Sequence, residues 1–370
     1  MNSKSSSQST GSIDWILLAA VAALIAIGLM VVYSSTFDMG NRLHEDPAYF
    51  FKRQLTWLAI GSMFLIVAAR LRYQHWMKLS VLIMVAALVL LVVLVIFGQG
   101  RHLLGNSISP AELAKLAIVI YISHWLYSKG ELLRRLPYGL LPFTIIVGLV
   151  AGLVMAQPDL SEALVIVLMS VAMFFLAGAD LLQFLIGILG GSVAFAFVIT
   201  RLPVAMERLQ PYLSDWRNPL GSANDQLKQG LMALGSGGIL GLGPGNGRMK
   251  YQWLPAAHTD SIFAVVGEEL GLVGCVALIA LFAVVAYRGF RIAEKAPDGF
   301  GRLLACGITC WIVFQAMINI AVVTGTMPFT GIVLPFVSVG GSSLVTCMVG
   351  IGIMLSISRS SGKPMLQKAA

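Results

Sequence analysis

Four groups of ionisable residues lie inside or beside long apolar stretches of the sequence, where they could do chemistry. The groups are Glu112 with Lys115, Asp159 with Glu162, His258 with Asp260, and Glu268 with Glu269. An ionisable side chain in an apolar span is costly, so each is a candidate functional residue. A carboxylate can act as a general base on a hydroxyl group, or hold a divalent cation such as Mg²⁺ or Mn²⁺ against a diphosphate. A lysine can neutralise phosphate directly.

Several of these residues also have a structural interpretation. Glu112 and Lys115 are spaced i, i+3, so they can form an ion pair on one helix face. Asp159 and Asp260 each stand before an apolar run, where an aspartate can cap a helix N-terminus. His258 can be a hydrogen-bonding residue at a membrane interface. Single residues leave these alternatives open, and the shared position of the groups relative to the membrane is the stronger signal.

The elements that must position these residues are membrane-spanning helices. Of the 370 residues, 58% are hydrophobic and 11% are charged, whereas soluble domains carry about 25% charged residues. Apolar segments recur near the ~20 residues with which a helix crosses a bilayer. The sequence therefore predicts an all-α integral membrane protein of about ten transmembrane helices. The predicted spans are 15–35, 54–69, 78–97, 111–127, 138–156, 161–178, 181–200, 261–287, 303–325 and 336–357.

Lysine and arginine residues predict the orientation of the chain. With both termini in the cytoplasm, fourteen of them lie in inner loops and tails and four in short outer loops, as the positive-inside rule requires. We therefore expect a disordered cytoplasmic tail at 1–12, a single polytopic membrane domain at 13–358, and a second cytoplasmic tail at 359–370. Residues 201–260 are then a large extracytoplasmic loop between helices 7 and 8. In this arrangement all four ionisable groups lie in the outer half of the membrane.

Charge and cysteine content exclude two other classes of site. The net charge is +8, but the basic residues sit mostly in short loops without interleaved aromatic residues. We therefore expect contact with membrane lipids and no nucleic-acid binding. The four cysteines show neither a C-x-x-C pair nor a zinc-binding spacing with histidine, so we expect buried thiols.

Motifs around the ionisable groups follow one another in a set order over nearly the whole chain. They are Ser109-Pro110-Ala111-Glu112-Leu113-Ala114-Lys115, Ala156-Gln157-Pro158-Asp159-Leu160, Leu234-Gly235-Ser236-Gly237-Gly238, His258 to Val265, Gly267-Glu268-Glu269-Leu270-Gly271, Asn319 to Gly325, and Leu334 to Ser343. In these motifs the chain resembles the SEDS family (shape, elongation, division and sporulation) of bacterial cell-wall proteins, of the FtsW/RodA type.

The resemblance implies a peptidoglycan glycosyltransferase at the outer face of the bacterial cytoplasmic membrane, acting in cell division or cell-shape maintenance. The implied substrate is lipid II, a disaccharide-pentapeptide on undecaprenyl diphosphate. The implied partners are a class B penicillin-binding protein, which is a transpeptidase, and other membrane proteins of the division or elongation machinery. Asp260 matches the catalytic position of the family. We expect substrate binding by Glu112, Lys115, Asp159, His258, Glu268 and Ser342, and no cofactor other than a divalent cation.

The sequence also departs from the family pattern. Ser109 stands where glutamine is usual, Ser161-Glu162 replaces Gly-Thr, Ser261 replaces phenylalanine and Val339 replaces tyrosine. The acidic residues of the motifs are all kept, which favours an active enzyme.

Two other functions remain open: a flippase for the lipid-linked precursor, and a scaffold that only recruits a transpeptidase. A flippase needs polar groups reachable from both leaflets, whereas here they gather in the outer half. A scaffold needs no buried carboxylates at all.

Overall fold

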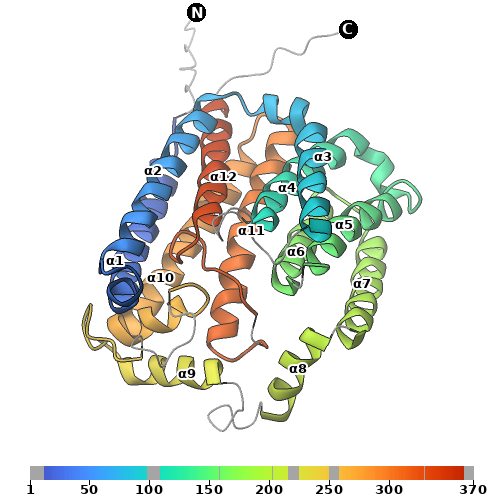
Figure 1. Cartoon of the computed structure of the whole chain (residues 1–370). Coiled ribbons are helices and arrows are strands. Elements are labelled where there is room, and N and C mark those ends of the chain that lie inside the picture. Colours follow the sequence, from blue (N-terminus) through green and yellow to red (C-terminus); the bar gives the residue numbers. More distant parts are fainter. Residues whose placement is uncertain are drawn as a thin grey trace, which may run out of the picture.

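The chain folds into a bundle of α-helices (Figure 1). The structure, a computed structural model, describes residues 12–97, 109–157, 159–201, 203–215, 225–249, 258–328 and 330–361. Within these ranges every regular element is a helix. The helices are α1 (Trp15–His44), α2 (Tyr49–Arg70), α3 (Gln74–Phe97), α4 (Pro110–Lys129), the 3₁₀ helix η1 (Gly130–Arg134), α5 (Leu140–Met155), α6 (Leu160–Leu176), α7 (Leu181–Arg201), α8 (Pro203–Asp215), α9 (Asp225–Gly237), α10 (Ile262–Glu294), α11 (Gly299–Val323) and α12 (Gly341–Ser360).

Helix length and composition make this a multi-pass membrane protein. Among the described residues, α1, α2, α3, α10, α11 and α12 are long and apolar enough to cross a membrane. Helices α5 and α6 and the first part of α7 are apolar but shorter. Each predicted span overlaps one helix, so the all-α membrane class is confirmed. The number of helices that cross the bilayer, and the domain boundaries, stay predictions.

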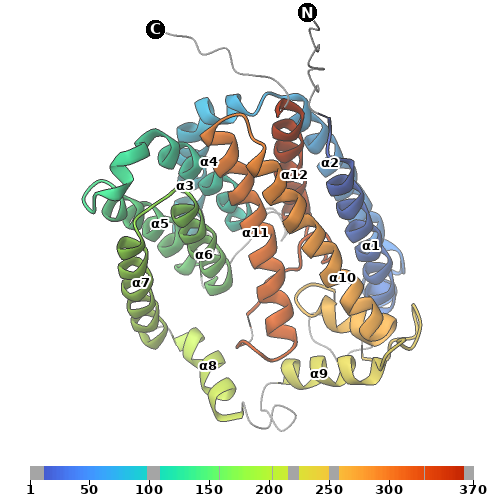
Figure 2. The same cartoon turned by 180° about the vertical axis from the view of Figure 1, so that it is seen from behind.

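The segment 201–260, expected to be a loop, contains two further helices. Helix α8 follows α7 almost directly, and α9 lies across the end of the bundle (Figure 2). Helix α9 packs on α10 through small residues: a Cβ atom on Gly237 would lie 1.9 Å from the carbonyl oxygen of Gly267. Both helices are shorter than a membrane span and partly polar, and a search for membrane-length apolar runs does not detect such elements.

Helices α11 and α12 form the centre of the bundle. In each of them 72% of the most apolar stretch is buried inside the protein. Helix α12 packs closely along α2, since a Cβ atom on Gly61 would lie 2.6 Å from Met348 Sδ, and one on Gly352 would lie 2.5 Å from the Leu65 carbonyl oxygen. Small residues permit such close helix approach where lipid offers little hydrophobic drive for association.

Polar contacts tie the helices together at the end of the bundle where α1 begins and α12 ends, which we call the terminal end. The Arg288 guanidinium pairs with the Asp14 carboxylate at 2.6 Å. The Tyr73 hydroxyl donates to the Asp298 carboxylate at 2.8 Å. These contacts connect the start of α1 with α10, and the loop after α2 with the start of α11. The opposite end, which we call the pocket end, carries α9 and the turn before α10.

Candidate functional site

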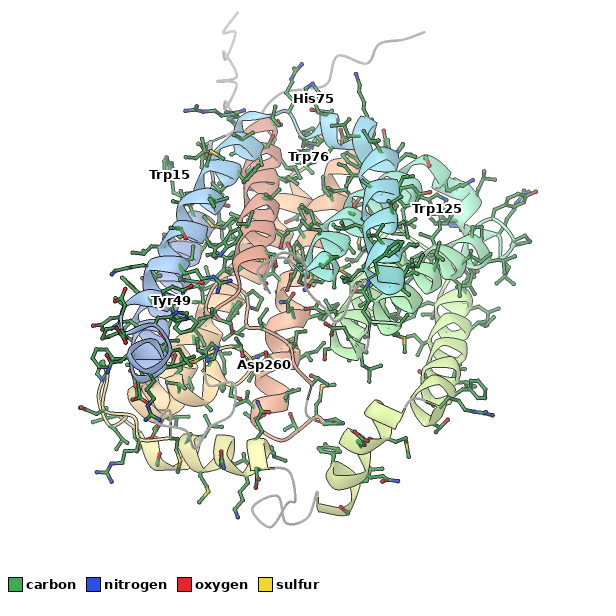
Figure 3. All side chains as sticks on the ribbon, viewed as in Figure 1. Trp15, Tyr49, His75, Trp76, Trp125 and Asp260 are labelled. Atoms are coloured by element: carbon green, nitrogen blue, oxygen red, sulfur yellow. The ribbon has the colours of Figure 1, made fainter. Side chains whose placement is uncertain are left out.

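A cavity of about 530 Å³ brings together most of the residues that the sequence singles out. Its walls come from the end of α1, the start of α2, the starts of α4 and α6, the turn before α10, and the segment between α11 and α12. The lining includes Glu112, Asp159, Glu162, His258, Asp260 and Ser342. Figure 3 shows Asp260 in the half of the molecule away from His75 and Trp76, toward the pocket end. Residues more than 200 positions apart in the sequence therefore share one cavity.

Hydrogen bonds to three main-chain carbonyl oxygens hold the turn that carries Asp260. The carbonyl oxygen of His258 accepts from the Val339 amide at 3.0 Å, and that of Thr259 accepts from the Ser338 hydroxyl at 2.6 Å. The carbonyl oxygen of Asp260 accepts from Asn319 Nδ2 at 2.9 Å. Because these bonds use carbonyl oxygens, they fix the turn without engaging the Asp260 carboxylate.

The N-terminus of α10 does not begin at Asp260. Ser261 occupies the N-cap position, with φ −100° and ψ 15°. Asp260 therefore stands one residue before the N-cap position that the structural alternative assigns to it. The Asp260 side chain instead lines the cavity and is partly exposed there.

The segment from Thr330 to Gly340 forms one wall of the cavity, where the sequence predicts the start of the last span. It is not helical, and α12 begins only at Gly341. Phe336 has φ 66°, a left-handed conformation that is rare for a bulky residue. The segment packs so closely on α1 that a Cβ atom on Gly28 would lie 2.7 Å from Val337 Cα. Tertiary contacts, which no local pattern reveals, therefore displace the start of the helix.

Glu112, Lys115 and Glu162 form a buried ion-paired triad beside the cavity. The Lys115 ammonium lies 2.9 Å from Glu112 Oε2 and 2.5 Å from Glu162 Oε2. It also donates to Gln315 Oε1 at 2.6 Å. An ammonium group has three hydrogens to donate, so these three acceptors satisfy it completely.

The triad changes the expected role of Lys115. Its side chain is 0% exposed and does not belong to the cavity lining. Its ammonium is instead surrounded by the carboxylates that a buried charge needs, and substrate binding by Lys115 stays a prediction. Glu112 and Glu162 line the cavity. The Glu112–Lys115 ion pair that the sequence allows is present, and Glu162 joins it.

Asp159 combines both of its proposed roles. Its carboxylate accepts from the Glu162 amide at 3.4 Å at the N-cap position of α6, and it also lines the cavity. His258 lines the cavity from the turn before α10, with its ring 6.0 Å from that of Phe50. Burial lowers the pKa of His258 below its ordinary value, so its ring is neutral at pH 7. The Ser342 hydroxyl accepts from the Ser109 amide at 3.1 Å at the cavity edge.

Glu268, which the sequence leads us to expect in substrate binding, does not belong to the cavity lining. Its carboxylate is 0% exposed and accepts from the amides of Arg248 and Met249, at 2.7 Å and 3.1 Å. Glu269 accepts from the Gly245 amide at 3.0 Å and from the Ser34 hydroxyl at 2.5 Å. Both carboxylates therefore anchor the loop that follows α9, and their contacts suit positioning of the chain better than substrate binding.

A glycine-rich turn over residues 237–243 closes a break in α10. Helix α10 is interrupted at Gly271, which has φ 66° and ψ −165°. The broken helix bonds to the turn instead: the amides of Leu272 and Val273 donate to the carbonyl oxygens of Gly238 and Ile239, at 2.9 Å and 3.2 Å. The amides of Leu242 and Gly243 donate to the carbonyl oxygens of Glu268 and Glu269, both at 3.0 Å. The turn therefore also holds the part of α10 before the break, which follows Asp260.

Several cavity residues escape sequence reasoning. Arg53, Gln54 and Trp57 line the cavity from α2. Among the described lining residues, Arg53 alone carries a permanent positive charge. Glu162 is one of the ionisable candidates from the sequence, whereas Arg53 stands in a short outer loop and contributes there only to the charge count. The signal that identifies both is that each is an ionisable residue at the outer end of a predicted span.

The cavity combines carboxylates with a guanidinium. Asp260 is placed to take a proton from a hydroxyl group, and Arg53 to face an anionic group such as a phosphate. The arrangement of these side chains suits metal binding less well than proton transfer and anion binding. Among the described residues, no group of three or more His, Cys, Asp and Glu side chains is arranged to hold a metal ion.

Comparison with known proteins identifies relatives along almost the whole chain. The family model FTSW_RODA_SPOVE, described as "Cell cycle protein", matches residues 14–363. A probable peptidoglycan glycosyltransferase FtsW of Trichlorobacter lovleyi is 37% identical, with 93% of each chain covered. Stage V sporulation protein E of Bacillus subtilis is 38% identical, over 94% of this chain and 97% of that protein.

Solved structures show the same fold. A chain from a peptidoglycan synthase complex, described as coordinating polymerization and crosslinking, superposes with a TM-score of 0.75 at 28% identity, covering 94% of this chain and 98% of that chain. The rod shape determining protein RodA of Thermus thermophilus superposes with a TM-score of 0.69 at 27% identity, covering 94% and 97%.

Proposed function

This chain belongs to the FtsW/RodA/SpoVE family of cell cycle proteins and is a peptidoglycan glycosyltransferase, and we propose that it polymerises lipid II in the cavity around Asp260. The observation that carries this proposal is the convergence of Asp260, Asp159 and Arg53 on one cavity. A scaffold would need no such set of charged groups. The reaction belongs to the division or cell-shape functions of the family.

The chemistry asks for a base and for an anion-binding group. The acceptor sugar hydroxyl loses its proton as the anomeric carbon of the donor loses its diphosphate. The Asp260 carboxylate takes that proton, a role worth roughly 10²–10⁴-fold in rate. Arg53 faces the leaving diphosphate, which takes both electrons of the broken carbon–oxygen bond. Asp159, His258 and Ser342 line the space in which the sugars are held.

The requirement for a divalent cation, which the sequence leads us to expect, stays a prediction. Four carboxylates lie in the cavity lining, from Glu112, Asp159, Glu162 and Asp260. Two of them are already paired with Lys115, and the described residues hold no metal-binding cluster. The residues therefore do not form a ready-made cation site, and the mechanism above uses the side chains of the chain alone.

The proposed location is the bacterial cytoplasmic membrane, with both termini in the cytoplasm and the cavity outside. The positive-inside rule supports this orientation. Arg70, Arg72, Arg288 and Arg359 gather at the terminal end: Arg288 pairs with Asp14, and Arg359 donates to the Arg70 carbonyl oxygen. The cavity lies toward the pocket end, which this orientation places on the outer face of the membrane.

The proposed partner is a class B penicillin-binding protein, together with other membrane proteins of the division or elongation machinery. The superposable chain from a peptidoglycan synthase complex supports a crosslinking partner. An exposed apolar face on α10, formed by Leu272, Val273, Val276 and Ile279, is available for a single-span partner. Gly325 is not part of an exposed face, since a Cβ atom there would lie 3.1 Å from Leu227 of α9.

Reconstitution tests the function directly. Purified protein in liposomes is supplied with fluorescent lipid II, with and without a single-span class B penicillin-binding protein, and the products are separated by length. We expect glycan strands of many disaccharide units, and longer or more abundant strands with the partner. Fluorescent lipid II that crosses the bilayer without forming strands would support the flippase alternative and contradict the proposal.

A further inference from the structure

Two amide side chains on consecutive turns of α11 lie between the triad and the Asp260 turn. Gln315 is 0% exposed and Asn319 is 1% exposed. Their i, i+4 spacing places them on one face of the helix. Neither residue belongs to the cavity lining, so any effect on the reaction must pass through the residues that they contact.

Gln315 connects the triad with the cavity wall. Its Oε1 atom accepts from Lys115 Nζ at 2.6 Å and from Trp311 Nε1 at 2.8 Å. Its Nε2 atom donates to the Val333 carbonyl oxygen at 3.1 Å. The orientation of the amide follows from chemistry, because the reverse orientation would set an NH₂ group against two donors.

Asn319 connects the Asp260 turn with the same wall. Its Nδ2 atom donates to the Asp260 carbonyl oxygen at 2.9 Å and to the Ile332 carbonyl oxygen at 2.7 Å. Both amide hydrogens are therefore used, and a flipped amide would set an oxygen against two carbonyl oxygens. Asn319 fixes the main chain of the residue whose carboxylate is proposed to act as the base.

We propose that Gln315 and Asn319 are positioning residues that set the Asp260 carboxylate relative to the triad and the cavity wall. Gln315 contacts Lys115 of the triad and Val333 of the cavity wall. Asn319 contacts Asp260 and the preceding wall residue, Ile332. One rigid helix thus holds three parts of the site in register. This inference rests on the proposed function of Asp260.

The consequence is a specific kinetic signature. A misplacement of about 1 Å caused by a residue away from the chemistry can lower a rate by ~10²-fold. Loss of the Asn319 donors should therefore slow the chemical step while leaving the groups that bind lipid II in place. A merely structural role would instead reduce the amount of folded, lipid-binding protein and leave the rate of each folded molecule unchanged.

The experiment compares variants of Asn319 with a matched control. Asn319→Leu is close in size and removes both donors, and Asn319→Ser is smaller and keeps one hydroxyl donor. Thr309→Val is the control, since Thr309 is equally buried in α11 but donates only to Ala305 of its own helix, at 2.7 Å. For each purified protein, the turnover number and KM for fluorescent lipid II are measured, together with the lipid II bound per protein before turnover.

We expect Asn319→Leu to lower the turnover number by about 10- to 100-fold, with KM and bound lipid II close to wild type. Asn319→Ser should lose less, and Thr309→Val should match the wild type. Wild-type turnover in both Asn319 variants, or a rate loss that equals the loss of bound lipid II, would overturn the inference. A wild-type protein without polymerising activity would overturn the proposed function, and this inference with it.

Discussion

Lys115 is the residue whose loss the structure predicts to be the most damaging to stability. Its removal would leave Glu112 and Glu162 buried beside each other without a counter-charge. Breaking a buried ion pair in this way costs about 3–5 kcal/mol. We therefore expect Lys115→Met to lower the unfolding temperature of the purified protein strongly. Glu162→Gln should cost less, because the Glu112–Lys115 pair persists.

A surface ion pair provides the control for this prediction. Lys52 pairs with Asp46 at 2.8 Å, but the two side chains are 67% and 36% exposed. Exposed pairs contribute about 0–1 kcal/mol, so Lys52→Met should change the unfolding temperature little. Equal unfolding temperatures for Lys115→Met and Lys52→Met would contradict the structural role of the triad.

His258 predicts a pH dependence of stability. Burial holds the pKa of His258 below its unfolded value of 6.5, so the unfolded chain binds a proton more readily than the folded one. The stability contribution of the neutral ring is present above pH 6.5 and is lost as the pH falls through the folded pKa. His258→Gln should therefore flatten the decline of the unfolding temperature below pH 6.5. The same slope in wild type and His258→Gln would contradict this account, and exposed His75→Gln is the control.

The ionisable residues of the site could be found from the sequence because charge in an apolar span is rare. That rule finds Glu112, Asp159 and Asp260, all of which line the cavity. It does not say where a carboxylate points, so Glu268 is included although it anchors a loop. The same rule cannot find Asn319, because an uncharged amide in a helix carries no comparable signal.

At the scale of elements, the length of an apolar segment predicts that a helix is present, but it does not predict where that helix is interrupted. Each predicted span overlaps a helix, because ~20 apolar residues in lipid must satisfy their own backbone. The break in α10 depends on hydrogen bonds from the glycine turn about thirty residues earlier. A pattern read along the chain does not contain that pairing.

Substitution of Gly271 tests the packing of the glycine-rich turn against α10. A Cβ atom on Gly271 would lie 2.3 Å from the Gly241 amide nitrogen, and the φ of 66° disfavours any other residue. Strained backbone of this kind costs on the order of 1–3 kcal/mol, and the clash adds to it. We expect Gly271→Ala to lower both the unfolding temperature and the yield. In Gly148→Ala a Cβ atom would meet nothing within 4 Å, so it should behave as wild type; equal behaviour of the two variants would contradict the packing described.

At the scale of the whole molecule, the two ends differ in a way that favours chemistry on one face. The terminal end is closed by the Asp14–Arg288 and Tyr73–Asp298 contacts. The cavity lies at the pocket end, with the fully buried Lys115, Trp311 and Gln315 beneath it. A flippase would need a polar path to both leaflets, whereas the described cavity lining includes none of the residues of these terminal-end contacts.

Cysteine labelling of intact cells tests the orientation. Ser128 at the end of α4 and Glu207 on α8 are both exposed, and the four native cysteines are buried. We expect Glu207→Cys to react with a membrane-impermeant maleimide added outside, and Ser128→Cys to react only after permeabilisation. External labelling of Ser128→Cys would reverse the proposed topology.

The central claim is that the Asp260 carboxylate carries out the chemistry, and polymerisation of fluorescent lipid II by purified Asp260→Asn tests it most directly. The substitution keeps the size of the side chain and the backbone bond to Asn319, and Ser261 remains the N-cap of α10. We therefore expect a folded protein that binds lipid II but polymerises it about 10²–10⁴-fold more slowly, or not measurably. Wild-type polymerisation by a folded Asp260→Asn protein would contradict the account.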